Sequence, residues 1–174
     1  MRWMWIDRIL TYEPGHRLVA IKNVSMAEEH LHDHFAADAD GPALPVMPAS
    51  LIIEGMAQTA GILVGAEQRF AEKVILAKVS KVTLERDVVP GQTLRYEARL
   101  ERMDDAGAST RGTVLLSDPA GDDPTPVKIG EIDLLFSHLD QNLGGIEFPE
   151  ENFVFSDNFR LILRQAGLGE LAGT

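Results

Sequence analysis

The sequence has no cysteine, and this excludes both a disulfide framework and thiol chemistry. Basic residues are also in deficit, with 16 lysines and arginines against 27 aspartates and glutamates, so the formal net charge is −11. A protein that binds nucleic acid through its phosphates needs a basic face, and this charge balance argues against such a partner.

Long uninterrupted apolar runs are missing as well. The first ten residues mix charged with apolar side chains, unlike a secretory signal peptide. The most apolar stretch, residues 49–66, contains Glu54 and Gln58 and is bracketed closely by Pro48 and Glu67. These polar residues favour a buried core helix over a membrane span. We therefore expect a cytoplasmic protein without a membrane partner.

Residues 49–66 predict a central helix that is apolar on nearly every side, so most of its surface must be buried. Glu54 is the ionisable residue inside this run, and a carboxylate is costly to desolvate without a partner. The nearest candidate in sequence is His34, on a segment that we expect to be extended. A histidine and a carboxylate suit paired acid–base catalysis, although the same pair also fits a buried structural contact without chemistry.

The segment that contains His34 has three histidines at alternate positions, in the string HLHDH of residues 30–34. On an extended chain they would share one face, which is the arrangement of a metal site. However, their spacing is one residue short of the HxHxDH motif of metallo-β-lactamase-like hydrolases, and the strand-rich segment typical of that fold does not precede it. We expect no metal and no cofactor.

Short segments of alternating polarity predict an antiparallel sheet. Two strands flank a Pro-Gly turn at Glu13–Gly15, and a bulge or bend is expected near Ser80–Lys81. Strands are expected within residues 5–25, 74–87, 94–101, 111–117 and 127–138. One helix placed early among antiparallel strands indicates an α+β fold, with the sheet wrapped around one long buried central helix. We divide the chain into a domain of residues 1–139 and a C-terminal extension, 140–174, in which residues 158–166 could form a short helix.

Two strings of the sequence resemble one known family. DHF (residues 33–35) and PVMPASLIIEGMAQTAGIL (residues 45–63) are similar to the active-site segment of the 3-hydroxyacyl-[acyl-carrier-protein] dehydratases, whose pattern is GHF, a proline-rich turn, PG and LIIEAMAQ. Residues 6–25 and 76–94 resemble the family's first hairpin and its strand with a Pro-Gly turn. The similarity runs in order over residues 3–138, so it is more specific than any single short motif.

The resemblance implies a hot-dog fold and the removal of water from 3-hydroxyacyl thioesters of fatty-acid biosynthesis, giving trans-2-enoyl thioesters. His34 would be the base for the C2 proton. Glu54 would be the acid for the C3 hydroxyl, or would orient the leaving water through Gln58. The N–H groups of Ala49 and Ser50 would bind the thioester carbonyl. The family also implies an acyl carrier protein as partner, and a homodimer, or a trimer of dimers, whose sites combine the histidine of one protomer with the acid of the other.

The sequence departs from the family pattern at two places. Glu54 follows His34 by 20 positions, whereas the family motif implies about 14. The loop of residues 36–44 accounts for this difference and can project outward at small entropic cost. Ala49 replaces the glycine whose N–H would polarise the carbonyl.

These departures leave two other functions open. An acyl thioesterase of the same fold would use Glu54 to activate water, and a non-catalytic protein would bind acyl thioesters without turnover. Docking to an acidic carrier protein would need a local basic patch. The candidates for that patch are Lys73, Lys78, Lys81, Arg86, Arg95 and Arg99.

Overall fold

The computed structural model describes residues 4–33, 35–39, 41–121, 123, 125–139 and 156–170. The strands of this described part form one antiparallel sheet in the order β1-β2-β4-β5-β6-β3. Its strands are β1 (Arg8–Glu13), β2 (Arg17–Asn23), β3 (Lys73–Leu84), β4 (Thr93–Asp104), β5 (Gly107–Ser117) and β6 (Val127–Leu139). Its helices are α1 (His30–Asp33), α2 (Ala49–Glu67) and α3 (Asp157–Gln165).

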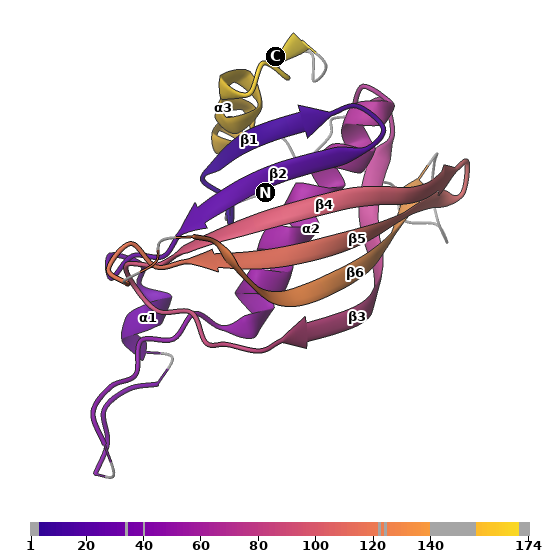
Figure 1. The fold of residues 1–174 in the computed structure, drawn as a ribbon. Coiled ribbons are helices and arrows are strands. Elements are labelled where there is room, and N and C mark those ends of the chain that lie inside the picture. Colours follow the sequence, from indigo (N-terminus) through magenta and orange to yellow (C-terminus); the bar gives the residue numbers. More distant parts are fainter. Residues whose placement is uncertain are drawn as a thin grey trace.

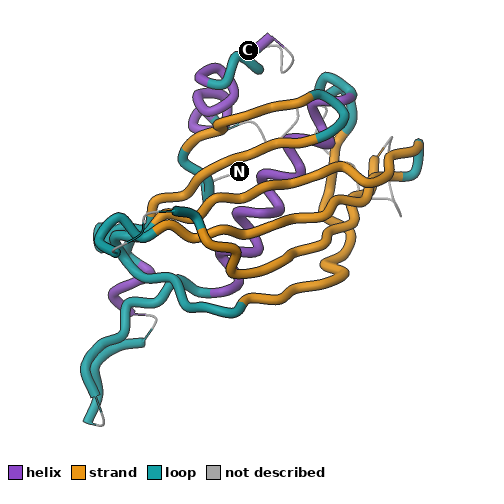
Figure 2. The backbone as a smooth tube through the Cα atoms, viewed as in Figure 1, coloured by secondary structure: helices purple, strands orange, loops and turns teal. Residues whose placement is uncertain are grey.

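The sheet curves around α2, which lies along its concave side (Figures 1 and 2). Met56 and Leu63 of α2 are fully buried, and so is Tyr96 of β4, at the centre of the sheet. By length and hydropathy alone α2 could cross a membrane, but 67% of its apolar window is buried inside this fold. The predicted α+β arrangement, a sheet wrapped around one long buried helix, is therefore confirmed.

The hairpins of the sheet extend further than the alternation of the sequence predicts. The β4 and β5 strands pair as far as Asp104 and Gly107, so only two residues turn the chain between them. The alternation of apolar and polar residues ends before the strands do, because the last paired residues lie beyond the buried part of the sheet. The bulge expected near Ser80–Lys81 is confirmed by register shifts in β3, the second of which lies between Val79 and Lys81.

The histidine-rich segment differs from the prediction. We expected an extended chain, but residues His30–Asp33 form the short helix α1. The chain before it is already turning, because the Ser25 hydroxyl accepts the N–H of Ala27 at 3.1 Å and the Glu28 carboxylate accepts the N–H of Ser25 at 3.2 Å. Such local hydrogen bonds favour a helical turn over an extended strand. His34, which follows α1, lies outside the described residues.

The inserted loop between α1 and α2 projects from the body as an arm (Figure 1). Its two sides bond to each other, because the N–H of Leu44 donates to the carbonyl of Phe35 at 2.9 Å and that of Asp38 to the carbonyl of Gly41 at 3.1 Å. Phe35 and Leu44 are 51% and 53% exposed. The insertion thus points outward, as predicted.

The C-terminal extension contains the short helix that the sequence suggested. Helix α3 begins at Ser156, whose side chain accepts the N–H of Phe159, and it packs against β1 with Phe159, Ile162 and Leu163 buried. The sequence left open what this helix covers, and the structure shows that it is β1 of the same chain. The boundary at residues 139/140 stays a prediction, because residues 140–155 lie outside the described part.

Candidate active site

Glu54 and Gln58, two polar residues of α2, form a hydrogen-bonded pair. Glu54 is half-buried and Gln58 is 4% exposed. They are four residues apart and therefore neighbours on one side of the helix, where the Nε2 of Gln58 donates to the Oε1 of Glu54 at 2.9 Å. The carboxyl group thus has a polar partner within its own helix, which offsets part of the cost of its burial.

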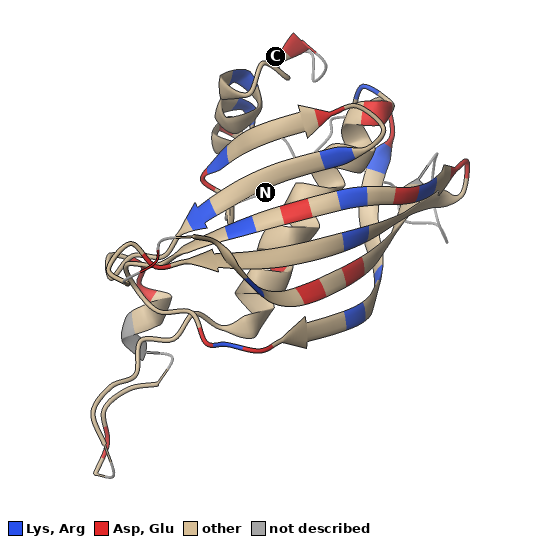
Figure 3. Cartoon of the chain, in the orientation of Figure 1, with Lys and Arg blue, Asp and Glu red and all other residues tan. Residues whose placement is uncertain are grey.

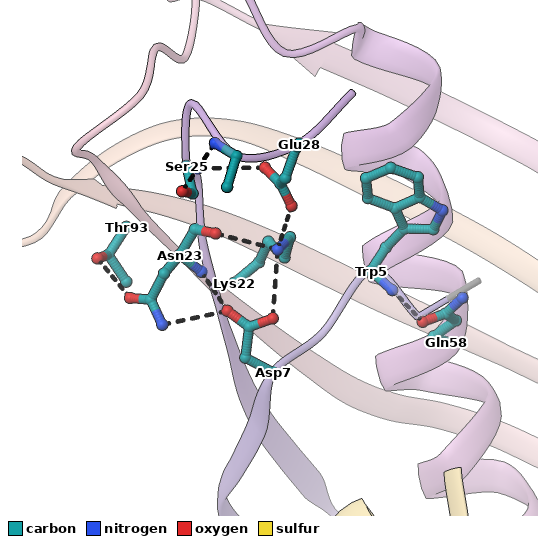
Figure 4. Close-up of polar contacts among 9 residues, drawn as sticks. Trp5, Asp7, Lys22, Asn23, Ser25, Glu28, Gln58 and Thr93 are labelled. Carbon is teal, nitrogen blue, oxygen red and sulfur yellow. Dashed lines mark hydrogen bonds and ion pairs between the residues drawn. The ribbon is translucent and has the colours of Figure 1, made fainter. Parts of the chain in front are cut away.

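Gln58 also holds the N-terminal segment of the chain. Its Oε1 accepts the backbone N–H of Trp5 at 2.8 Å (Figure 4). The indole of Trp5 makes an edge contact with the ring of His30 in α1, with 5.1 Å between the ring centroids. The segment around Trp5 therefore touches both the histidine-rich helix and the glutamate-bearing helix. Nothing in the sequence pattern around Trp5 signals this bridging position.

The start of α2 offers free backbone donors. Pro48 is the N-cap, with φ −56° and ψ 134°, and its carbonyl accepts the N–H groups of Leu51 and Ile52 at 2.9 and 3.3 Å. Within the described chain the N–H groups of Ala49 and Ser50 have no partner. Because these N–H groups lie at the positive end of the helix dipole, they suit a negatively polarised oxygen.

A cavity of about 430 Å³ opens at this end of α2. Ala49 lines it and Ser50 does not, and both residues are exposed. The walls come from the end of the projecting arm, the first turn of α2 and the chain that leaves β3, and they comprise Phe35, Val46, Met47, Pro48, Ala49, Ile52, Leu84, Glu85, Arg86 and Asp87. The structure thus brings Ala49 to the cavity and places Glu54 and Gln58 further along the same helix.

A buried lysine was missed by the sequence analysis. Lys22 of β2 is only 7% exposed, and its Nζ lies 3.2 Å from Asp7 and 2.5 Å from Glu28 (Figure 4). The signal was present, because Lys22 continues the alternation of Leu18 and Ala20, whose side chains face the core. Two carboxylates offset the cost of burying this charge, and through Glu28 they tie β2 to the segment that leads into α1.

Tyr96 is buried beside the same cluster. Burial, and then the negative charges of Asp7 and Glu28, raise the pKa of Tyr96 well above its ordinary value of 10.0. Its hydroxyl has no hydrogen-bond partner among the described residues, and it lies against Gly55, next to Glu54 in α2. This phenol therefore remains neutral and fills space between the sheet and α2.

The expected basic patch is not continuous. Arg95 and Arg99 lie on β4, and strands β5 and β6 separate them from β3 (Figure 3). Arg95 also contacts Glu97 at 3.2 Å. The other candidates belong to one segment, β3 and the chain that follows it, and they are Lys73, Lys78, Lys81 and Arg86. Arg86 also lines the cavity.

The predicted pair of His34 and Glu54 stays a prediction, because His34 is not among the described residues. For the described part of the chain, no group of three or more histidine, aspartate or glutamate side chains could hold a metal ion.

The sequence matches a family of known proteins. The FabA-like domain model matches residues 2–118. The 3-hydroxyacyl-[acyl-carrier-protein] dehydratase FabZ of Clostridium kluyveri is 31% identical over 141 residues, which span 80% of this chain and 88% of that relative. FabZ of Symbiobacterium thermophilum is 39% identical over 102 residues, spanning 58% of this chain and 68% of the relative.

Solved structures share the architecture at low sequence identity. A thioesterase family protein from Silicibacter pomeroyi superposes with a TM-score of 0.57 at 15% identity, over 76% of this chain and 83% of that one. The Escherichia coli PaaI protein superposes with a TM-score of 0.55 at 9% identity, over 75% and 78% of the two chains. These similarities speak for the fold alone, and they confirm the predicted hot-dog fold. The family match and the dehydratase relatives show that the chain belongs to the 3-hydroxyacyl-[acyl-carrier-protein] dehydratase family, a family of hydro-lyases.

Proposed function

We propose that this protein removes water from 3-hydroxyacyl thioesters carried by an acyl carrier protein and releases trans-2-enoyl thioesters in fatty-acid biosynthesis. The observation that carries the proposal is the pairing of Glu54 with Gln58 on a buried helix whose first residue, Ala49, lines a cavity, in a chain of the dehydratase family. A half-buried carboxyl group and an anion-stabilising helix end are two of the three groups that this reaction needs.

The elimination assigns one step to each group. His34 accepts the proton from C2, and the electron pair of the C2–H bond forms the C2=C3 double bond. The C3–O bond breaks, and the hydroxyl leaves as water with the proton that Glu54 delivers. Negative charge that develops on the thioester carbonyl oxygen during C2 deprotonation is stabilised by the N–H groups of Ala49 and Ser50. The N–H of Ala49 can serve although a side chain replaces the family glycine, because the donor belongs to the backbone.

The working unit in this proposal is a homodimer in the cytoplasm, alone or within a trimer of dimers, in which each site combines His34 of one protomer with Glu54 of the other. The exposed edge of the sheet supports a second copy as partner. Strand β3 lies at this edge, and it carries apolar side chains, Leu76, Val79 and Val82, that are 40%, 40% and 38% exposed. An open edge strand with apolar side chains favours pairing with another chain.

The test is turnover by the purified protein of 3-hydroxyacyl and trans-2-enoyl thioesters, with carrier-protein and coenzyme A forms compared. We expect interconversion of the two, and a fall of about 10²- to 10⁴-fold for either His34→Ala or Glu54→Gln, as for the loss of a general acid or base. His16→Ala and Glu101→Gln are matched controls, because both side chains are exposed and lie outside the candidate site.

Three results would contradict the proposal. Release of free acid and thiol would indicate a thioesterase, and binding without turnover would indicate an acyl-binding protein. Equal rates for the wild type and both site variants would remove His34 and Glu54 from the mechanism.

A further inference from the structure

We propose that the arm, residues 35–44, is a clasp that packs against a second copy of this chain. Its contact surface on that copy is the turn after α2 together with the start of β3. The inference rests on the proposed function, because it adds a contact to the homodimer given there. It assigns a role to the insertion that separates this chain from the family pattern.

The arm has the composition of an interface rather than that of a solvated loop. It consists mainly of alanine, with one phenylalanine, one proline and one leucine, and its charged residues are Asp38 and Asp40. The two largest side chains, Phe35 and Leu44, are 51% and 53% exposed. A projecting segment whose large apolar side chains stay half-exposed is typical of a surface that another protein covers.

The base of the arm adjoins the free edge of the sheet. Phe35 lines the same cavity as Leu84 and Arg86, so the arm leaves the body where β3 ends. From there it reaches beyond β3, the last strand at this edge (Figure 1). A second copy that associates through β3 therefore lies beside the arm.

Two-fold symmetry determines which part of the second copy the arm meets. When an edge strand pairs with its own copy in a closed dimer, the two strands run in opposite directions. The end of β3 at Leu84 then lies beside the start of the same strand, at Lys73 of the partner subunit. The turn after α2 leads into this strand, so Arg69 of the partner subunit lies at the same end.

The charges of the two surfaces are complementary. The arm carries two aspartates and no basic residue, whereas β3 carries three lysines and no acidic residue. Arg69, in the turn before β3, is exposed. Since the whole chain has a formal net charge of −11, two copies repel each other over much of their surface. The basic strand is a place where a second copy attracts an acidic segment.

The first test compares two leucines of equal exposure. Leu44 on the arm is 53% exposed, and Leu161 on α3, at the opposite edge of the sheet, is 51% exposed. Leu44 does not line the cavity, so its substitution leaves the candidate site in place. We expect Leu44→Ser to raise the Kd of the dimer about 10- to 100-fold, because each copy loses one apolar contact. Leu161→Ser should leave the Kd unchanged.

Sedimentation equilibrium over a dilution series measures both values. A wild type that stays monomeric would overturn the proposal. The same holds for equal Kd values of the wild type and Leu44→Ser, or for an equal rise in Leu44→Ser and Leu161→Ser.

The second test locates the contact, and the absence of cysteine makes it specific. Leu44→Cys protein is mixed with mass-tagged Arg69→Cys protein, and after subunit exchange a short bismaleimide is added. We expect a cross-linked mixed dimer, and much less product when Leu161→Cys protein replaces the Arg69→Cys protein. Equal yields from the two mixtures would overturn the proposal, because the arm would then have no preferred place on the second copy.

Turnover distinguishes failure of this inference from failure of the proposed function. Dehydration by a dimer whose Kd does not respond to Leu44→Ser would overturn the inference alone. A raised Kd in a protein without turnover would contradict only the proposed function. If Leu44→Ser leaves the Kd unchanged but raises KM for carrier-protein thioesters and not for coenzyme A thioesters, the arm binds the carrier protein and the inference is wrong.

Discussion

Two residues that the reaction does not use show how local surroundings shape this protein. Lysine side chains are usually exposed, but Lys22 lies buried between Asp7 and Glu28, because the alternation of β2 turns its side chain inward. Tyr12 lies on the first hairpin, and its hydroxyl donates to Oε1 of Glu67 at the end of α2 at 3.1 Å. The same carboxylate accepts the N–H of Gly15 at 2.5 Å, so one side chain fastens the hairpin turn to the central helix.

Tyr12 should give the protein a measurable alkaline transition. Burial, followed by the charge and hydrogen bond of Glu67, raises the pKa of Tyr12 from 10.0 to about 12. The neutral phenol is thus favoured by folding, so its contribution to stability is fully present below pH 10 and is lost as the pH rises toward about 12. As the pH rises from 10 to about 12, the free energy of unfolding of Tyr12→Phe, measured with urea, should therefore fall less than that of the wild type.

The sequence has only two tyrosines, which makes the same transition visible by tyrosinate absorbance. Tyr12 should ionise near pH 12, and Glu67→Gln should move its ionisation toward pH 10. Tyr96→Phe serves as the control, because it leaves the contact between Tyr12 and Glu67 in place. Ionisation of Tyr12 at its ordinary pH in the wild type would contradict the role given to Glu67.

The sequence predicted helices and strands best where the apolar residues follow a single pattern over a whole segment. Helix α2 is the best example. Aromatic rings lie against two of its glycines, Tyr96 against Gly55 and Phe70 against Gly65. These contacts arise because α2 is enclosed by side chains of the sheet and by the turn that follows the helix.

The two glycines Gly55 and Gly61 should respond oppositely to alanine. A Cβ at position 55 would lie 2.5 Å from the hydroxyl of the fully buried Tyr96, which has no room to move. Gly55→Ala should therefore destabilise the fold by about 1 to 3 kcal/mol, as overpacking does. A Cβ at position 61 meets only the ring of Phe136, at an ordinary 3.6 Å. Gly61→Ala should stabilise the helix by about 0.5 to 1 kcal/mol.

Thermal and urea unfolding of the two single variants measure this difference. A neutral effect at position 55 would mean that the ring of Tyr96 relaxes away from α2. Equal destabilisation at both positions would mean that the helix as a whole tolerates no added volume.

At the scale of the whole molecule, the two edges of the sheet differ. Helix α3 packs against β1, whereas β3 at the other edge exposes apolar side chains. This asymmetry favours association through β3. Association at this edge also agrees with the proposal that a complete site combines groups of two protomers.

Mixing two inactive variants tests the shared site. His34→Ala and Glu54→Gln homodimers should each be nearly inactive. After subunit exchange, half of the dimers are mixed, and each mixed dimer has one site with both groups intact. An equimolar mixture should therefore regain about a quarter of the wild-type activity. No recovery, with exchange verified by mass spectrometry of the dimers, would place both groups of each site on a single protomer.

The sequence by itself determined the fold class, the buried helix with Glu54 and Gln58, the hairpin strands and the family. These features depend on periodicity and on motif spacing, which are properties of neighbouring residues. The helical turn at α1 was missed because hydrogen bonds of Ser25 and Glu28 turn the chain just before it, which the alternating pattern does not reveal. Only the tertiary structure decided that Trp5 reaches Gln58 and that Lys22 lies between two acids, because these contacts join residues far apart in the chain whose meeting depends on the packing of the whole sheet around α2.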